Sequence, residues 1–178
     1  MKLSVWIKAF TLFISASFSQ QLFAEPLKIG DLAPNFKLTD QHSEVISLNQ
    51  YQGQWVVLYF YPKDDTPGCT KEACSFRDNI NRLINQQAVI LGVSVDSIES
   101  HQAFATKFEL PFSLLADEDA TVSKSYGALL NLGFVKFTKR HSFIIDPSGK
   151  IAKIYRDVDP DEHVQQVLED LKSLQKGL

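Results

Sequence analysis

The chain has 178 residues, 44% of them hydrophobic, and its 18 basic and 21 acidic side chains give a net charge of −3. This length and composition suit one globular domain with its own core, and no basic stripe is present that would indicate a nucleic-acid partner. The sequence contains no glycine-rich phosphate loop, so no cofactor is expected. Its histidines are scattered singly, without the spacing of a metal site, so no metal is expected either: His42, His101, His141 and His163.

Residues 1–24 have the pattern of a secretory signal peptide. Lys2 and Lys8 lie near the start, Ala9 to Ser19 is an uncharged and largely apolar stretch, and Ala24 is a small residue at which cleavage can occur. The apolar stretch is too short to span a bilayer, which needs roughly 20 apolar residues. We therefore predict a signal peptide over 1–24 and one folded domain over 25–178.

Export sets the expected location and redox environment of the domain. Cleavage after residue 24 leaves 16 basic and 21 acidic side chains, a net charge of −5. Cleavage after Ser19, an uncleaved anchor and full secretion are alternatives, but the periplasm of a Gram-negative cell is the location we expect, with no membrane attachment after cleavage. Two cysteines in such an oxidising compartment would pair by default, so a plain structural disulfide is one interpretation of Cys69 and Cys74.

The order of predicted elements indicates the fold class. Apolar and β-branched runs predict strands, and 3.6-residue apolar periodicity predicts helices. In chain order we expect a first strand and connector over 30–40 and 44–48, a strand at 55–61, a helix over 67–85, a strand at 88–95, a helix at 97–108, a short strand at 112–115, a short helix at 117–126, a hairpin over 139–156 and a helix at 159–174.

Certain side chains are expected to face the core from the predicted helices. In the helix over 67–85 these are Phe76, Ile80, Leu83 and Ile84; in the later helices they are Phe104, Phe108, Val164, Val167, Leu168 and Leu171.

The order β-α-β-α, then a hairpin, then a helix predicts an α/β fold with a mixed sheet covered by helices on both faces. It is similar to the thioredoxin-like order of elements, with extra N-terminal strands and an insertion between the two halves. In α/β folds the chemistry lies at the carboxyl edge of the sheet, where the helix after the 55–61 strand begins. The Arg140 end of the hairpin can approach this point, although an arginine at a strand start is often only a solvated residue.

Cys69 occupies an unusual position at the start of the predicted helix. Thr66 is a candidate N-cap and Pro67 a candidate first helical residue, which places Cys69 at the third helical position. There a thiolate faces unsatisfied backbone N–H groups and the positive end of the helix dipole, both of which favour the anion. The alternative is a buried and inert cysteine.

Cys74 follows Cys69 at a spacing that a regular helix cannot bridge. Five residues of helix separate the two Cα atoms by roughly 8.6 Å, whereas a disulfide needs about 4.4–6.8 Å. A disulfide between them therefore requires either that the first turns unwind or that this segment is a loop in every state. The spacing favours a pair that alternates between a reduced helical form and an oxidised, locally melted form.

The residues around Cys69 resemble those of a known family. Pro62-x-x-x-Thr66-x-x-Cys69 matches the peroxiredoxin active-site motif, and the string from Tyr61 to Arg77 looks like the peroxiredoxin Q, or bacterioferritin comigratory protein, type. The resemblance covers roughly residues 27–175 and includes Arg140 to Asp146, which match the arginine-bearing strand of the family.

This resemblance implies a thiol peroxidase with a thioredoxin-like fold. Cys69 would be the peroxidatic and Cys74 the resolving residue. Thr66, Pro62 and Arg140 would line the peroxide pocket, and Glu72 would help to orient the arginine. The implied partners are hydrogen peroxide or organic hydroperoxides and a thioredoxin-like dithiol protein as reductant, and the implied oligomeric state is a monomer.

Two other functions remain open from the residues. A secreted thiol–disulfide oxidoreductase would share the fold, but that chemistry generally uses a Cys-x-x-Cys pair, which the sequence lacks. A non-catalytic domain with a structural disulfide is the other. The connector over 127–139 and the export signal both differ from the usual family member.

Overall fold

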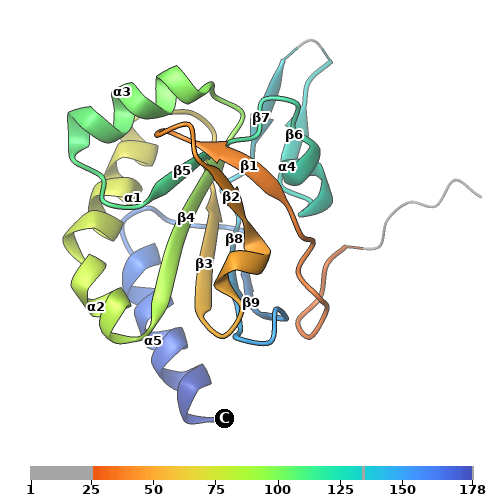
Figure 1. Cartoon of the computed structure of the whole chain (residues 1–178), viewed down its shortest axis with the longest axis vertical. Coiled ribbons are helices and arrows are strands. Elements are labelled where there is room, and N and C mark those ends of the chain that lie inside the picture. The colour runs from red at the N-terminus through yellow and green to blue at the C-terminus, as the bar shows by residue number, and fades with distance from the viewer. Residues whose placement is uncertain (1–25, 134, 178) are drawn as a thin grey trace, which may run out of the picture.

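The computed structural model describes residues 26–133 and 135–177, so the predicted signal peptide lies outside the described residues. Its elements, shown in Figure 1, are β1 (Lys37–Asp40), β2 (Val45–Ser47), the 3-10 helix η1 (Leu48–Tyr51), β3 (Trp55–Phe60), α1 (Pro67–Asp78), α2 (Ile80–Asn85), β4 (Ala88–Ser94), α3 (Ile98–Phe108), β5 (Ser113–Ala116), α4 (Thr121–Ser125), β6 (Leu129–Asn131), β7 (Lys136–Thr138), β8 (Ser142–Ile145), β9 (Ile151–Tyr155) and α5 (His163–Lys176).

A seven-stranded mixed sheet forms the centre of the molecule, in the order β2-β1-β5-β4-β3-β8-β9. The strands β3, β4 and β5 run parallel, whereas β8 is antiparallel to β3, β9 to β8, and β1 to β5. The predicted mixed sheet, the antiparallel hairpin and the closing helix are therefore confirmed, and β1 and β2 are the N-terminal extension.

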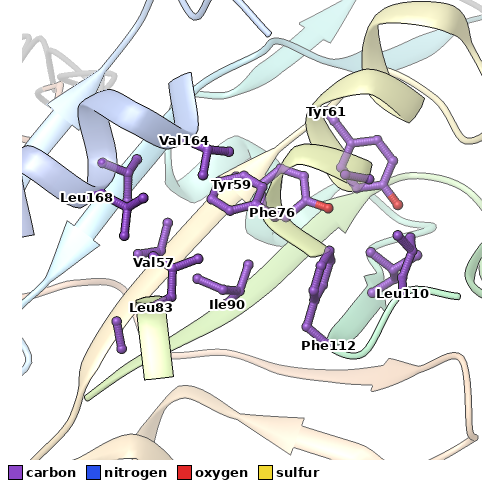
Figure 2. Packing of buried hydrophobic residues seen from close by; sticks show 14 of the residues in the cluster. Val57, Tyr59, Tyr61, Phe76, Leu83, Ile90, Leu110, Phe112, Val164 and Leu168 are labelled. Carbon is purple, nitrogen blue, oxygen red and sulfur yellow. The ribbon is translucent and has the colours of Figure 1, made fainter. Parts of the chain in front are cut away.

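Helices cover both faces of the sheet, each over its own apolar cluster. Alternate residues of β3 point to opposite faces: Val57 and Tyr59 join the cluster beneath α1, α2, α3 and α5, shown in Figure 2, whereas Leu58 and Phe60 join the cluster beneath α4 and η1. All six residues of β3 are buried, as expected for a central strand with both faces covered.

The predicted helix over 67–85 is two helices, α1 and α2, with a break at Asn79. The Asn79 side chain donates from Nδ2 to the Ser75 carbonyl at 2.9 Å, and its backbone departs from helical geometry. Such side-chain bonds to the preceding turn compete with the helical ladder. The break turns Ile84 out to 59% exposure, so the prediction that Ile84 faces the core is wrong, whereas Phe76 and Leu83 are fully buried as predicted.

Two other segments differ from the sequence-based expectation. The first strand is shorter than the predicted 30–40 range, because the chain turns at Gly30 in a positive-φ conformation and pairs regularly only from Lys37. The connector over 127–139 forms the hairpin β6–β7, a separate two-stranded sheet that extends from the body of the molecule beside α4 (Figure 1). Within the described ranges no helix is both long and apolar enough to cross a membrane.

Candidate active site

The candidate site lies where β3 ends and α1 begins. As predicted, Thr66 is the N-cap residue of α1, with an extended backbone, and Pro67 is the first helical residue. The Thr66 hydroxyl does not cap the helix, because it donates instead to the Lys63 carbonyl at 3.0 Å. Cys69 thus occupies the third helical position, close to the unsatisfied N–H groups of the first turn.

The side chain of Arg140 contacts the Cys69 sulfur. Arg140, 71 residues further along the chain, donates from Nη2 to Cys69 Sγ at 3.3 Å. Cys69 is 2% exposed and belongs to the apolar cluster under α1 and α5, while the Arg140 side chain is 18% exposed. The Arg140 guanidinium is therefore a cation placed directly against a buried sulfur.

Glu72 holds the other branch of the Arg140 fork. It lies one turn after Cys69 on α1, is fully buried, and accepts a hydrogen bond from Arg140 Nη1 on Oε2. Burial raises the pKa of Glu72 to about 7, against the opposing effect of Arg140. Burial opposes the charge on Arg140, but Glu72 and Cys69 outweigh it and raise the pKa of the guanidinium. The arginine therefore stays charged and lies between two acidic groups.

Gly68 leaves the space that this arginine needs. A Cβ atom built on Gly68 would lie 3.2 Å from Arg140 Nη2 and 3.7 Å from Pro160 Cγ. The second helical residue therefore needs to be small for the guanidinium to reach over the first turn to Cys69.

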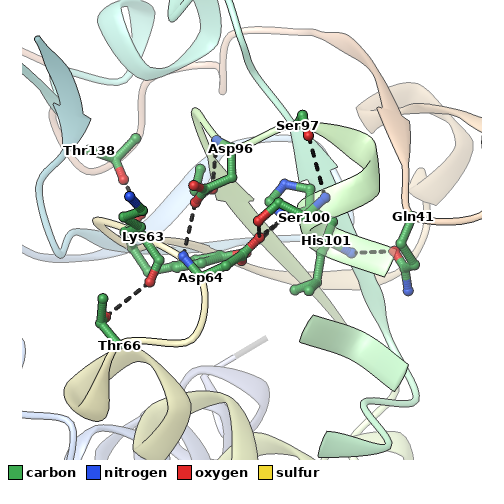
Figure 3. A network of polar contacts seen from close by, with 12 residues as sticks. Gln41, Lys63, Asp64, Thr66, Asp96, Ser97, Ser100, His101 and Thr138 are labelled. Carbon is green, nitrogen blue, oxygen red and sulfur yellow. Dashed lines mark hydrogen bonds and ion pairs between the residues drawn. The ribbon is translucent and has the colours of Figure 1, made fainter. Parts of the chain in front are cut away.

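A buried polar network braces the loop that precedes Cys69 (Figure 3). The Asp64 carboxylate accepts hydrogen bonds from the Tyr61 and Ser100 hydroxyls, both at 2.7 Å, and lies 2.8 Å from His101 Nδ1. The Asp64 backbone N–H donates to Asp96 at 2.9 Å. These contacts tie the loop to α3 and to the end of β4, and Thr138 of β7 adds a hydrogen bond to the Tyr61 carbonyl.

The structure brings together some predicted site residues more closely than others. Cys69, Arg140 and Glu72 are in direct contact, and Thr66 lies one turn before the sulfur. Pro62 directly follows Tyr61 in the loop and is partly exposed. Cys74 is a partly exposed free thiol on the same continuous helix as Cys69, which is also free.

An open cleft of about 780 Å³ adjoins Arg140 and is lined by residues of the β7–β8 and β9–α5 connections, among them His141 and Arg156. Burial, then the charges of Arg156 and Lys139, lower the pKa of His141 to about 4. His141 is therefore neutral at pH 7, and Arg140 is the charged side chain that connects this cleft with the sulfur.

Sequence reasoning missed Asp64, His101 and His163, which are all buried close to the site. The position of Asp64 within the motif segment was a signal that could have been used, but the histidines have no local signature, since only the fold places them there. In the described part of the chain, no group of three or more His, Cys, Asp or Glu side chains is arranged to hold a metal ion.

Residues 29–154 match the AhpC/TSA family. The chain is similar to a protein named putative peroxiredoxin bcp from Coxiella burnetii, with 44% identity over 146 residues that cover 80% of this chain and 97% of the relative. It is 41% identical to peroxiredoxin Bcp of Bacillus subtilis over 83% of this chain and 97% of that protein. Among solved structures, the Xylella fastidiosa PrxQ C47S mutant aligns with a TM-score of 0.79 and 34% identity, covering 84% of this chain and 98% of that one.

Proposed function

The chain belongs to the AhpC/TSA family, as a peroxiredoxin of the Q/Bcp type, and we propose that Cys69 is its peroxidatic residue, held beneath Arg140, with Cys74 as the resolving residue. The protein is a thiol peroxidase, and its substrates are peroxides. The contact between Arg140 Nη2 and Cys69 Sγ is the observation that supports this assignment most directly.

In the first step the Cys69 thiolate attacks the nearer oxygen of the hydroperoxide and breaks the O–O bond. The sulfur is oxidised to a sulfenic acid, and the far oxygen leaves as water or an alcohol once it has taken a proton. The Arg140 Nη2 group lies beside the sulfur and can donate to the peroxide oxygens as negative charge moves onto them. One preorganised donor of this kind is typically worth about 3–4 kcal/mol in the transition state.

Thr66 and Pro62 complete the peroxide pocket. The Thr66 hydroxyl donates to Lys63, which leaves its oxygen free to accept a hydrogen bond from the O–H of the hydroperoxide. Pro62 has no N–H, so it can shield the sulfur from water without competing for hydrogen bonds.

In the second step the Cys74 thiol attacks the Cys69 sulfenic acid, and one water is released as the disulfide forms. An external dithiol protein of the thioredoxin-like type then reduces this disulfide and becomes oxidised itself. Because both cysteines lie on α1, the second step requires that the helix unwind.

Titration with hydrogen peroxide tests the roles of the two cysteines. The reduced protein should lose both thiols rapidly with one equivalent of peroxide. The Cys74→Ser variant should consume one equivalent and then fail to turn over with a dithiol protein reductant, while Cys69→Ser should not react. Sustained turnover of Cys74→Ser would show that another group resolves the sulfenic acid, and slow thiol loss in the wild type would favour an oxidoreductase or a structural role.

We also propose that the protein acts as a monomer in the periplasm, after removal of residues 1–24. The charge and apolar pattern of that segment supports export. Fractionation of the native host, with sequencing of the mature N-terminus, should find a periplasmic protein that begins at Glu25. A cytoplasmic protein that retains Met1 would contradict the proposed location and would change which reductants can reach it.

A further inference from the structure

The imidazole of His163 is buried beside the site with no hydrogen-bond partner. It is the first residue of α5 and has no exposed surface, and neither Nδ1 nor Nε2 has a partner among the described residues. Edge-on contacts with the rings of Phe76 (5.7 Å) and Tyr155 (5.1 Å) hold its plane. Burying a polar ring without a hydrogen-bond partner in the protein is costly to folding, so the position of His163 needs a physical reason.

A second buried polar atom without a partner lies close to this ring and belongs to the active site. Glu72 gives Oε2 to Arg140, but its other oxygen, Oε1, is buried and accepts no hydrogen bond among the described residues. This oxygen lies 3.8 Å from His163 Nε2. A side-chain shift of well under 1 Å would bring the two atoms within hydrogen-bond distance.

The charges around the pair determine which partner carries the proton. Burial and then the charge of Arg140 lower the pKa of His163 to about 4, so its ring is neutral at pH 7. Glu72 faces Arg140 from the β7–β8 connection, Cys69 on its own helix and Tyr59 on β3. Burial raises the pKa of Tyr59, which keeps this phenol neutral. The Tyr59 hydroxyl is also a neutral donor without a partner among the described residues, but it lies against Gly92 of β4. His163 Nε2, at 3.8 Å, is the neutral donor that lies beside the free oxygen of Glu72.

We propose that His163 is a positioning residue of the peroxidase site, whose neutral imidazole donates from Nε2 to Oε1 of Glu72. This bond favours the charged carboxylate, which in turn holds Arg140 with its other amino group on the Cys69 sulfur. The inference rests on the proposed role of Arg140, and it adds to the site a residue from α5 that does not touch the substrate.

The test compares two substitutions of His163. His163→Phe keeps a ring between Phe76 and Tyr155 but removes both nitrogens, whereas His163→Gln keeps an amide N–H near the position of Nε2. The measurement is the second-order rate constant for oxidation of Cys69 by hydrogen peroxide, between pH 5 and 9. Hydrogen bonds to charged groups are strong enough that we expect His163→Phe to be slower by about tenfold or more at pH 7.

The pH profile separates positioning from packing. Without its donor, the Glu72 carboxylate takes up a proton at higher pH, so the acid limb of the His163→Phe profile should move to higher pH. The rate constant of His163→Gln should stay within about threefold of wild type, and the acid limb of its pH profile should not move. The proposal is overturned if His163→Phe shows the wild-type rate and profile, or if both variants are impaired equally.

A measurement on the unmodified protein covers the case in which His163→Phe does not fold. Nitrogen-15 NMR of the reduced protein at pH 8, where Glu72 is ionised, should show His163 as the neutral tautomer with its proton on Nε2. An imidazolium, or a proton on Nδ1, would overturn the proposal. The Arg140→Ala variant, measured in parallel, separates the proposed function from the role of His163. If Arg140→Ala reacts with hydrogen peroxide at the wild-type rate, the proposed function is contradicted. If Arg140→Ala reacts slowly but His163→Phe reacts at the wild-type rate, only the role of His163 is contradicted.

Discussion

At the scale of single residues, the central feature is a guanidinium held between a sulfur and a carboxylate. Arg140 gives Nη2 to Cys69 and Nη1 to Glu72, and the Glu72 side chain is wholly buried. Buried ion pairs often add little to stability, because taking the charges out of water offsets their attraction. The value of this pair is therefore geometric: the carboxylate directs the planar fork so that one amino group remains on the sulfur.

At Glu72, the protonation state that favours folding differs from the one that holds Arg140 in place. Folding raises the pKa of this carboxyl from its ordinary value of 4.5 to about 7, so the folded state favours the protonated form. The stability that this proton contributes is fully present below pH 4.5 and is lost as the pH rises through 7. The charged form, which holds Arg140, is thus the less favourable one for folding.

Glu72→Gln tests this conflict, because the amide is neutral at every pH. The free energy of unfolding of the wild type, taken relative to Glu72→Gln, should fall by about 3 kcal/mol between pH 4.5 and 7.5. Denaturant titrations of both proteins at several pH values measure this difference. A difference that stays constant, or that grows in favour of the wild type as the pH rises, would show that Arg140 overcomes the cost of burying the charge.

Residue-level prediction succeeded where a motif was present and failed where only the fold creates the contact. Cys69, Glu72 and Arg140 were named from the motif and lie in contact. His163 was described only as a scattered histidine, because nothing in its neighbouring residues indicates that α5 places it beside Glu72.

At the scale of elements, α1 contains the chemistry and also the obstacle to its second step. Cys69 and Cys74 share one continuous helix, whose inner side is anchored by the buried residues Ala73 and Phe76. A disulfide between positions five apart does not fit a regular helix. The break at Asn79 separates α1 from α2, so the unwinding can stop there and leave α2 in place.

Circular dichroism at 222 nm tests this unwinding. The helix α1 contributes 12 of the 48 α-helical residues in the described chain, so formation of the disulfide should remove up to about a quarter of the helical signal. The signal should return on reduction with a dithiol. Cys74→Ser is the control, because its oxidation stops at the sulfenic acid and should leave the signal unchanged. An oxidised wild type with full helical signal would mean that the two cysteines do not pair with each other.

The strength of each local pattern explains which elements could be predicted. The strands β3 and β4 are continuous apolar runs, and both were located to within one residue. The apolar face of α5 was predicted correctly, but the helix begins four residues later than expected. The break at Asn79 depends on one side-chain hydrogen bond, and the hairpin β6–β7 has only short strands. Neither feature produces periodicity that a sequence pattern could reveal.

At the scale of the whole molecule, strand direction explains why distant residues meet. Because β8 is antiparallel to β3 and pairs Ser142 with Tyr59, the start of β8 lies at the carboxyl end of β3. Arg140, just before β8, is thereby carried to the start of α1. The strand β9 is antiparallel to β8 and pairs Tyr155 with Ser142, so the chain that leads into α5 and His163 returns to the same edge.

This topology makes the site a meeting point of three segments that are remote in sequence. The mixed sheet was predictable from the order of elements, and with it the carboxyl edge as the location of the chemistry. The register that places Arg140 beside Cys69 and not beyond it was not predictable, because it depends on how β3 and β8 pair across the sheet.

The central claim is that the fold brings a cation onto the sulfur and that this cation drives the peroxide reaction. The most direct test is the second-order rate constant for hydrogen peroxide in Arg140→Ala, beside Lys139→Ala, which removes the same charge from the exposed neighbouring residue. The rate constant of Arg140→Ala should be lower by at least about a hundredfold, while Cys69 of this variant can still be alkylated. Lys139→Ala should react at the wild-type rate. An Arg140→Ala rate within about threefold of wild type would contradict the account.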